Sequence, residues 1–509
     1  MNDSVTCLCE NSKGALQTVK KLNLLGYDLG ASSGRAMLGE FDGEKLKISE
    51  LHRFINEPVR INGRLKWDVL YLFREMKQGL FKAHANGAVD GMAIDTWGVD
   101  FGLLDKNGDL LGNCTHYRDE STNGMMDEAF KIMPKNELFE RTGLAFLQFN
   151  TLYQLLALKK SGSPILDAAD TLLMMPDLLG YFFTGCKGTE YTIASTGQLI
   201  DPFKRDWCHE IIDRFELPAH IFTPIEQPGT MRGYLKDEIM NEVGCGRIPL
   251  INTASHDTAS AVAAVPAANE NFACISSGTW SIMGCELKTP LTRTEVLNAG
   301  YSNEGGVNGT ARLMKNIMGL WIIQECKRDW DRKGRNYSFA QIAEMAETAE
   351  PFMAIVDVDD PEFMAPGHMP RRIAEYCRKT GQAVPETDAQ IARLVFEGLA
   401  LAYRKAVESL ERDMLGHKVD ALNIVGGGSQ NILLNRFTAS AMGKPVIAGP
   451  GEATVIGNLL IQAMALGEIG SQSELRQVVR NSFETREYMP ESGLDWDGAY
   501  EKLLRMTAR

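Results

Sequence analysis

An aspartate, Asp28, stands where an apolar strand gives way to a turn of small residues, Gly30 to Gly34. A turn of Gly, Ala and Ser lets backbone N–H groups approach an anion closely, because no bulky side chain stands in the way. A carboxylate beside such an anion would repel it unless a metal ion lay between them, and Mg²⁺ is the ion that prefers oxygen ligands of this kind. The residues therefore predict a metal-assisted nucleotide-phosphate site, with Asp28 near the metal; a plain turn aspartate is the alternative.

A second aspartate, Asp257, precedes a predicted helix of small residues that begins at Ala259. Asp is a common N-cap residue, so a purely structural role is the alternative. His256 and Thr258 flank it with polar groups, and the small residues of the helix would let its start pack close to a ligand. These neighbours favour a chemical role for Asp257.

Two other segments combine polar or aromatic groups in a way that suits a sugar. Trp97-Gly98 sets an aromatic plate beside a residue without a side chain, although Trp97 could equally be a core residue. Lys315-Asn316 precedes an apolar run from 317 to 321, which we expect to be a helix whose N-terminus exposes polar groups or is merely capped by them.

Alternating apolar residues predict the strands that must hold these groups. The segments 24–29 and 36–41 form a strand–turn–strand unit, and 272–275 with 280–284 form a second one around Ser276 to Thr279. A third strand, 422–425, ends in Gly426, Gly427 and Gly428. Helical periodicity covers 69–85, and 91–95 is expected to be a buried strand. Two like units predict two similarly folded halves that face each other across a cleft, a preferred place for small ligands.

Several other nucleotide and catalytic motifs are missing or incomplete. The P-loop pattern does not occur, and the glycines from Gly426 to Gly428 continue to Asn431, where the dinucleotide fingerprint needs glycine or alanine. The run from Gly30 to Gly34 matches the G-x-S-x-G elbow of serine hydrolases, but that elbow needs a helix after the serine, and here a strand is predicted. An oxidoreductase or a hydrolase is therefore disfavoured.

The composition is that of an ordinary globular protein with room for two or more domains. The chain has 509 residues, 44% hydrophobic and 23% charged, and a net charge of −13, which disfavours nucleic acid as a partner. Its ten cysteines include Cys7 and Cys9 near the N-terminus but no zinc-binding spacing, so we expect reduced thiols. No apolar run is long enough to span a membrane, and no secretory signal is visible. We expect a cytoplasmic protein with no membrane partner.

Together these motifs resemble those of the FGGY carbohydrate kinases. The similarity extends from about Leu22 to Leu475. The strings that carry it are Asp-Leu-Gly-Ala-Ser-Ser-Gly-Arg from Asp28, Asp-Thr-Trp-Gly-Val-Asp-Phe from Asp95, Tyr117-Arg118-Asp119, Ser-His-Asp-Thr-Ala from Ser255, Ser-Ser-Gly-Thr-Trp from Ser276, Lys-Asn-Ile-Met-Gly-Leu-Trp from Lys315 and Val-Gly-Gly-Gly from Val425.

The resemblance implies an α/β fold of two similar actin/hexokinase-like ATPase domains, of the ribonuclease H-like kind, with a catalytic cleft between them. The expected divisions are an N-terminal extension (1–21) that is poorly ordered, an N-terminal domain (22–254), a C-terminal domain (255–475) and a helical tail (476–509). It also implies ATP and Mg²⁺, and transfer of phosphate to the primary hydroxyl of a ketose, L-rhamnulose first of all.

Individual roles follow from the positions that match the family's motifs. Asp257 would be the proton acceptor and Asp28 the residue near the metal. Sugar contacts would fall on Gly98, His256, Thr258 and Asn316. The nucleotide would lie on Ala31, Ser32, Ser33, Gly34, Arg35, Thr279, Gln324, Gly426, Gly427 and Gly428.

Two alternatives remain open at this point. Another ketose, such as L-fuculose or L-xylulose, could be the substrate, because epimers differ by one hydroxyl. An actin-like or chaperone-like ATPase without a sugar substrate would share the phosphate turns. A monomer and a homodimer are both compatible with the sequence.

Overall fold

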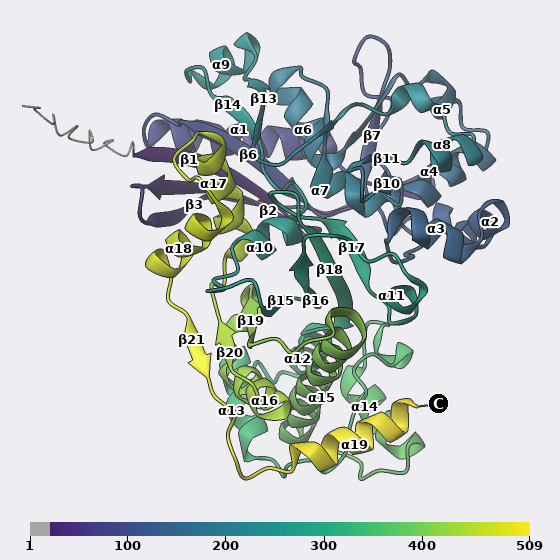
Figure 1. Cartoon of the computed structure of the whole chain (residues 1–509), viewed down its shortest axis with the longest axis vertical. Coiled ribbons are helices and arrows are strands. Elements are labelled where there is room, and N and C mark those ends of the chain that lie inside the picture. Colours follow the sequence, from purple (N-terminus) through teal and green to yellow (C-terminus); the bar gives the residue numbers. More distant parts are fainter. Residues whose placement is uncertain (1–20, 509) are drawn as a thin grey trace, which may run out of the picture.

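The computed structural model describes residues 21–508, and it is built around two mixed β-sheets (Figure 1). The expected N-terminal extension, with Cys7 and Cys9, lies outside the described residues except for Lys21. The first sheet has six strands. In spatial order these are β13 (Thr230–Tyr234), β14 (Pro249–Asn252), β6 (Gly91–Thr96), β1 (Leu22–Leu29), β2 (Ser33–Phe41) and β3 (Leu46–Ile55).

The second sheet has seven strands and lies in the other half of the molecule. In spatial order these are β17 (Ser302–Gly305), β18 (Ala311–Met318), β16 (Trp280–Leu287), β15 (Phe272–Ser277), β19 (Ala421–Val425), β20 (Val446–Ala448) and β21 (Arg486–Tyr488).

The two sheets repeat one topology. In the first, β1 pairs antiparallel with β2 and parallel with β6. In the second, β15 pairs antiparallel with β16 and parallel with β19 in the same way. Each sheet also continues through a third antiparallel strand, β3 or β18, on the hairpin side. The expectation of two like-folded α/β halves is confirmed.

Helices and short strands cover the sheets. Those before residue 255 are β4 (Val59–Ile61), β5 (Arg64–Lys66), α1 (Val69–Ala85), β7 (Phe101–Leu104), α2 (Met125–Ile132), α3 (Lys135–Thr142), α4 (Thr151–Lys160), α5 (Pro164–Ala168), β8 (Thr171–Met174), α6 (Met175–Thr184), β9 (Thr189–Glu190), α7 (Tyr191–Ala194), β10 (Ile200–Asp201), β11 (Asp206–Trp207), α8 (His209–Arg214), β12 (Ile225–Glu226) and α9 (Asp237–Val243). Those after it are α10 (Asp257–Ala263), α11 (Thr294–Asn298), α12 (Trp321–Arg332), α13 (Phe339–Thr348), α14 (Met369–Lys379), α15 (Asp388–Ser409), α16 (Ile432–Met442), α17 (Ala453–Ala465), α18 (Gln472–Ser482) and α19 (Trp496–Thr507).

Two helices, α10 and α17, pack against each other where the halves meet (Figure 1). Their backbones come unusually close, because a Cβ added at Gly457 would lie 1.9 Å from the carbonyl oxygen of Ser260. Helix α17 also packs on β1, where Asn458 lies against Gly26 and Gln462 donates to the carbonyl of Leu25 at 3.1 Å. The apolar core around these helices therefore contains side chains from both halves.

The structure corrects one expected element and adds a strand to the segment that was expected to be helical. Lys315 and Asn316 lie inside strand β18, and the helix that follows, α12, begins only at Trp321. The predicted helix N-terminus at these residues is therefore wrong: the run up to Met318 pairs with β16 instead. The segment expected as a helical tail carries α19 but also β21, which extends the second sheet. No helix among residues 21–508 is long and apolar enough to cross a membrane.

Candidate active site

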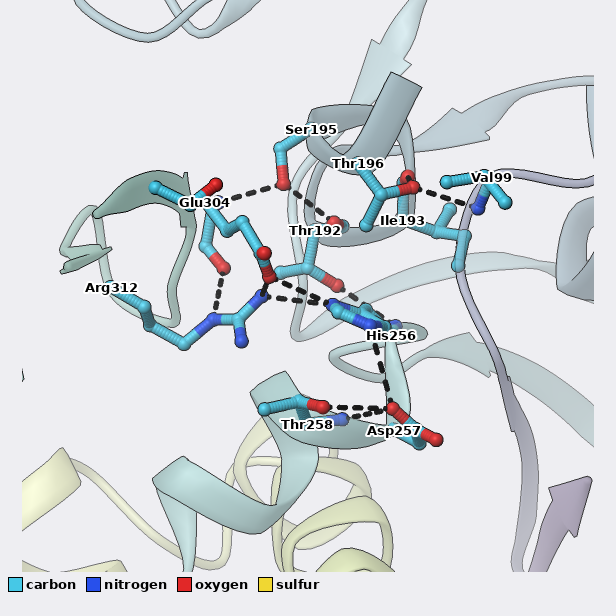
Figure 2. A network of polar contacts seen from close by, with 12 residues as sticks. Val99, Thr192, Ile193, Ser195, Thr196, His256, Asp257, Thr258, Glu304 and Arg312 are labelled. Carbon is cyan, nitrogen blue, oxygen red and sulfur yellow. Dashed lines mark hydrogen bonds and ion pairs between the residues drawn. The ribbon is translucent and has the colours of Figure 1, made fainter. Parts of the chain in front are cut away.

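The carboxylate of Asp257 lies at the first residue of α10, and His256 is the N-cap of that helix. Its Oδ1 atom accepts hydrogen bonds from the backbone N–H and, at 3.0 Å, from the hydroxyl of Thr258. His256 Nε2 lies 3.4 Å from the same oxygen (Figure 2). In the part of the chain that the structure describes, every such contact falls on Oδ1. The other oxygen, Oδ2, has none of these contacts among the described residues.

The ring of His256 is held from its other side by an ion pair (Figure 2). Nδ1 lies 3.2 Å from Glu304 Oε2 and 3.1 Å from Arg312 Nη2. Burial raises the pKa of Glu304, but the positive charge of Arg312 and the contact with His256 more than offset this and lower it to about 2. Glu304 is therefore ionised at neutral pH.

Asp28 lies at the end of β1, opposite Arg35 in the hairpin with β2 and beside Asp95 at the end of the parallel strand β6. Burial raises the pKa of Asp28, the ion pair with Arg35 counteracts this, and the charge of Asp257 adds to the increase. The charge of Asp257, in the second half, thus acts on Asp28 in the first. This brings together two of the residues that the sequence singled out.

Asp95 was not among the residues predicted for the site, although it ends a predicted strand much as Asp28 does. Its side chain is fully buried, Oδ2 accepts from Asn458 Nδ2 at 2.6 Å, and Oδ1 has no hydrogen-bond partner among the described residues. Burial, followed by the charge of Asp28, raises its pKa well above the usual value.

The first candidate phosphate turn is a closed hairpin bend. Gly30 N–H donates to the carbonyl of Ser33 at 2.9 Å, which ties the two ends of the turn together. Ser32 at its tip is exposed, and its carbonyl accepts from the N–H of Asn56. Gly34 allows the ring of Phe54 to pack against the backbone, since a Cβ there would lie 2.3 Å from that ring. These contacts tie the turn that holds Ala31 to Arg35 to strand β3 and the residue after it.

The nucleotide candidates of the second half form their own group. Thr279 Oγ1 lies 3.3 Å from Gln324 Oε1 on α12. The triple-glycine turn lies against β15, because a Cβ at Gly428 would be 1.9 Å from the hydroxyl of Ser277. Gly426 has φ +82°, a backbone conformation that favours glycine, whereas a Cβ at Gly427 would have no described residue within 4 Å.

The turn at Gly98 is backed by buried polar residues. Val99 has φ +69°, which is rare for a β-branched residue, and hydroxyls fix it on both sides. Its N–H donates to Thr196 Oγ1 at 2.9 Å and its carbonyl accepts from Thr151 Oγ1 at 2.7 Å. Asp100 then accepts from the indole N–H of Trp97 at 2.9 Å. This hydrogen bond orients the ring of Trp97. Trp97 is only 6% exposed, which agrees with the alternative that it is a core residue.

Asn316 is exposed on β18, four residues after Arg312, so both lie on one face of the strand. Because Arg312 contacts His256 from this face, Asn316 lies on the same side of the sheet as His256. Glu304 and Arg312 had no signal in the sequence, because only the pairing of β17 with β18 brings them together.

The donor set near Asp28 fits a magnesium ion. Mg²⁺ in phosphate-transfer sites is commonly held by one or two carboxylates, waters and the phosphates themselves. Asp28 and the unpartnered oxygen of Asp95 supply hard oxygen atoms on adjacent strands. Among residues 21–508 no group of three or more His, Cys, Asp or Glu side chains could hold a metal alone. The ion would therefore depend on the nucleotide for part of its coordination.

Comparison with solved structures shows the same overall fold. Gluconate kinase from Lactobacillus acidophilus superposes with a TM-score of 0.80 at 16% identity, covering 96% of this chain and 97% of that one. Glycerol kinase from Plasmodium falciparum, solved with ADP, gives a TM-score of 0.74 at 16% identity, covering 95% and 96%.

Sequence comparison gives much closer relatives. A rhamnulokinase from Bacteroides thetaiotaomicron is 43% identical over 481 residues, which is 94% of this chain and 98% of the relative. One from Bacillus subtilis is 40% identical over 464 residues, 91% and 94% of the two chains. The models of the N-terminal and C-terminal domains of the FGGY family of carbohydrate kinases match residues 23–264 and 273–466. This chain therefore belongs to the FGGY family of carbohydrate kinases.

Proposed function

We propose that this protein transfers the γ-phosphate of ATP to the primary hydroxyl of L-rhamnulose, forming L-rhamnulose 1-phosphate and ADP. The substrate is inferred from relatives named rhamnulokinase, about 40% identical over nearly the whole chain. Membership of a carbohydrate kinase family argues against the alternative of an ATPase without a sugar substrate.

The observation that carries the proposal is the one-sided hydrogen bonding of Asp257. Because Oδ1 already accepts hydrogen bonds, Oδ2 would accept the proton of the sugar hydroxyl. The hydroxyl oxygen would attack the γ-phosphorus as its proton leaves, and the bond between the γ-phosphorus and the ADP oxygen would break. A carboxylate is a weak base, but a loose phosphoryl-transfer transition state needs little prior deprotonation. Backbone N–H groups of the turns at Ala31 to Arg35 and at Thr279 would hold the phosphates.

Asp28, with Asp95 beside it, would hold Mg²⁺, which when bound neutralises charge on the phosphates. Gln324 and the triple glycine would contact the adenosine, and Gly98, His256, Thr258 and Asn316 the sugar, in a cleft between the domains 22–254 and 255–475. We also propose that the enzyme acts in the cytoplasm as a monomer or homodimer. The eight cysteines of the described residues are free thiols, which suits a reducing compartment.

A coupled ADP-release assay over a panel of ketoses tests the proposal. L-rhamnulose should give the highest kcat/KM, with L-fuculose and L-xylulose as the comparisons and a no-sugar control for ATP hydrolysis. ADP release that is fastest with another ketose would reassign the substrate, and release that no sugar stimulates would overturn the kinase itself.

A further inference from the structure

Glu304 and Arg312 are cross-strand partners at the edge of the second sheet. The register of β17 and β18 places them opposite each other, and Arg312 Nη2 lies 3.0 Å from Glu304 Oε2. The Arg312 side chain is 1% exposed, and its Nε also donates to the carbonyl of Gly305 at 2.7 Å. A buried guanidinium is tolerated only with such partners, so this pair is a fixed feature of the folded protein.

The pair meets the His256 ring at one atom. A guanidinium only donates and a carboxylate only accepts, and both lie within 3.2 Å of Nδ1. Nδ1 therefore has a partner whether it carries a proton or not. In the tautomer with the proton on Nε2, Nδ1 accepts from Arg312 while Nε2–H faces Asp257 Oδ1.

The same segment of the first half supports both sides of this contact (Figure 2). His256 N–H donates to Thr192 Oγ1 at 3.2 Å, and Gly305 N–H donates to Ser195 Oγ at 2.7 Å. Ser195 in turn donates to the carbonyl of Thr192 at 2.7 Å. The helix start that carries Asp257 and the strand that carries Glu304 are thus mounted on one short stretch, α7 and the residues after it.

We propose that Glu304 and Arg312 are positioning residues for phosphoryl transfer, which act through His256 to hold Asp257 Oδ1 and so keep Oδ2 directed at the sugar hydroxyl. The inference rests on the proposed function, in which Asp257 is the proton acceptor. It assigns a task to two residues that touch neither the base nor, on this account, the substrate. Small displacements of a catalytic group can reduce rates on the order of 10²-fold, so the positioning has a measurable effect.

The test is a double-mutant cycle on kcat with Glu304→Gln and His256→Ala. Glu304→Gln alone should lower kcat roughly 10- to 100-fold and leave the KM for ATP within about threefold, because the nucleotide turns are untouched. In the His256→Ala background the same substitution should lower kcat further by less than about twofold, because the residue through which Glu304 acts is gone. Equal effects in both backgrounds would overturn the proposal.

A matched control separates positioning from a loss of folding. Arg393 and Glu397 form another buried ion pair, 2.7 Å apart with side chains 5% and 1% exposed, inside α15. Glu397→Gln should leave kcat per folded molecule unchanged. Circular dichroism on the same samples gives the folded fraction. A kcat loss in Glu397→Gln equal to that in Glu304→Gln would overturn the proposal, because it would show a general effect of removing one partner of a buried ion pair.

Glu304→Asp provides a second variant if Glu304→Gln folds poorly. It keeps the charge and should recover part of the lost kcat. If Asp257→Asn retains near-normal turnover, the assignment of Asp257 as the proton acceptor fails, and the inference fails with it. If Asp257→Asn is inactive while both Glu304 variants have wild-type kcat, the inference alone fails.

Discussion

Arg35 and Asp28 form an ion pair across the hairpin of β1 and β2, which joins the candidate phosphate turn to the candidate metal ligand. A second nitrogen of the same guanidinium lies 2.7 Å from Glu452, the N-cap of α17. Arg35 therefore connects the first half to the helix that crosses between the halves, and it neutralises part of the negative charge that nucleotide phosphates would meet.

This arrangement predicts opposite effects of Asp28→Asn on two ligands. Without a metal the carboxylate repels phosphate, so the variant should bind ADP in EDTA more tightly, by roughly threefold to tenfold. With Mn²⁺ present a ligand is lost, so Mn²⁺·ADP should bind more weakly. Isothermal titration calorimetry and Mn²⁺ electron paramagnetic resonance measure both. A parallel decrease in both affinities would mean that Asp28 supports the turn rather than a metal.

The triple glycine offers a matched pair of substitutions. Gly428→Ala should reduce the free energy of unfolding by about 1–3 kcal/mol, because its Cβ would lie 1.9 Å from the Ser277 hydroxyl. The Cβ of Gly427→Ala would meet no atom of residues 21–508 within 4 Å, so the stability of this variant should stay within about 0.5 kcal/mol of wild type. If adenosine lies against this turn, Gly427→Ala should still weaken ADP binding. Urea denaturation and calorimetry separate the two effects, and unchanged ADP affinity in Gly427→Ala would move the nucleotide elsewhere.

The contact of α10 with α17 predicts that Gly457→Ala destabilises the protein. Alanine is favoured over glycine in a helix interior by about 1 kcal/mol. Here its Cβ would lie 1.9 Å from the carbonyl oxygen of Ser260, which is backbone and cannot rotate away. The helices must separate, and overpacking of this kind costs about 1–3 kcal/mol. Thermal denaturation should show a lower Tm, and a raised Tm would show that the helices part without penalty.

The lowered pKa of Glu304 predicts a specific pH dependence of stability. A carboxyl group with a folded pKa of about 2 and an ordinary value of 4.5 stabilises the fold above about pH 4.5, and this contribution is lost as pH falls toward 2. The stability gap between wild type and Glu304→Gln should therefore narrow by roughly 1 kcal/mol from pH 7 to pH 3.5. Urea midpoints at both pH values measure the gap. A gap that is constant with pH would show that Glu304 is not held ionised by Arg312 and His256.

The sequence predicted the parts of the fold that depend on local patterns. Helix α1 begins and ends at the predicted residues, Val69 and Ala85, because its apolar spacing and polar ends are clear. The hairpins around Asp28 and Ser277 were visible from alternation and small-residue turns. The prediction of a helix start at Lys315 and Asn316 was wrong, because the apolar run after them is too short to distinguish a strand from a helix by periodicity.

The candidate site was predictable where its residues lie next to runs of small residues. Asp28 at the end of β1 and Asp257 at the start of α10 have such neighbours, whereas Asp95, at the end of β6, is followed by Thr96 and Trp97. Glu304 and Arg312 are eight residues apart in an unremarkable stretch. The hairpin of β17 and β18 pairs them, but their approach to His256 and to the segment after α7 depends on contacts between residues far apart in the sequence, which no local pattern encodes.

The most direct test of the account is single-turnover phosphorylation of L-rhamnulose by wild type and Asp257→Asn, with ATP affinity measured on the same samples. Asparagine keeps the shape of the side chain but cannot accept the proton at Oδ2. We expect the rate of transfer to fall by about 10²–10⁴-fold while ATP binds with wild-type affinity. A variant that transfers phosphate at close to the wild-type rate would contradict the assignment of Asp257 as the proton acceptor.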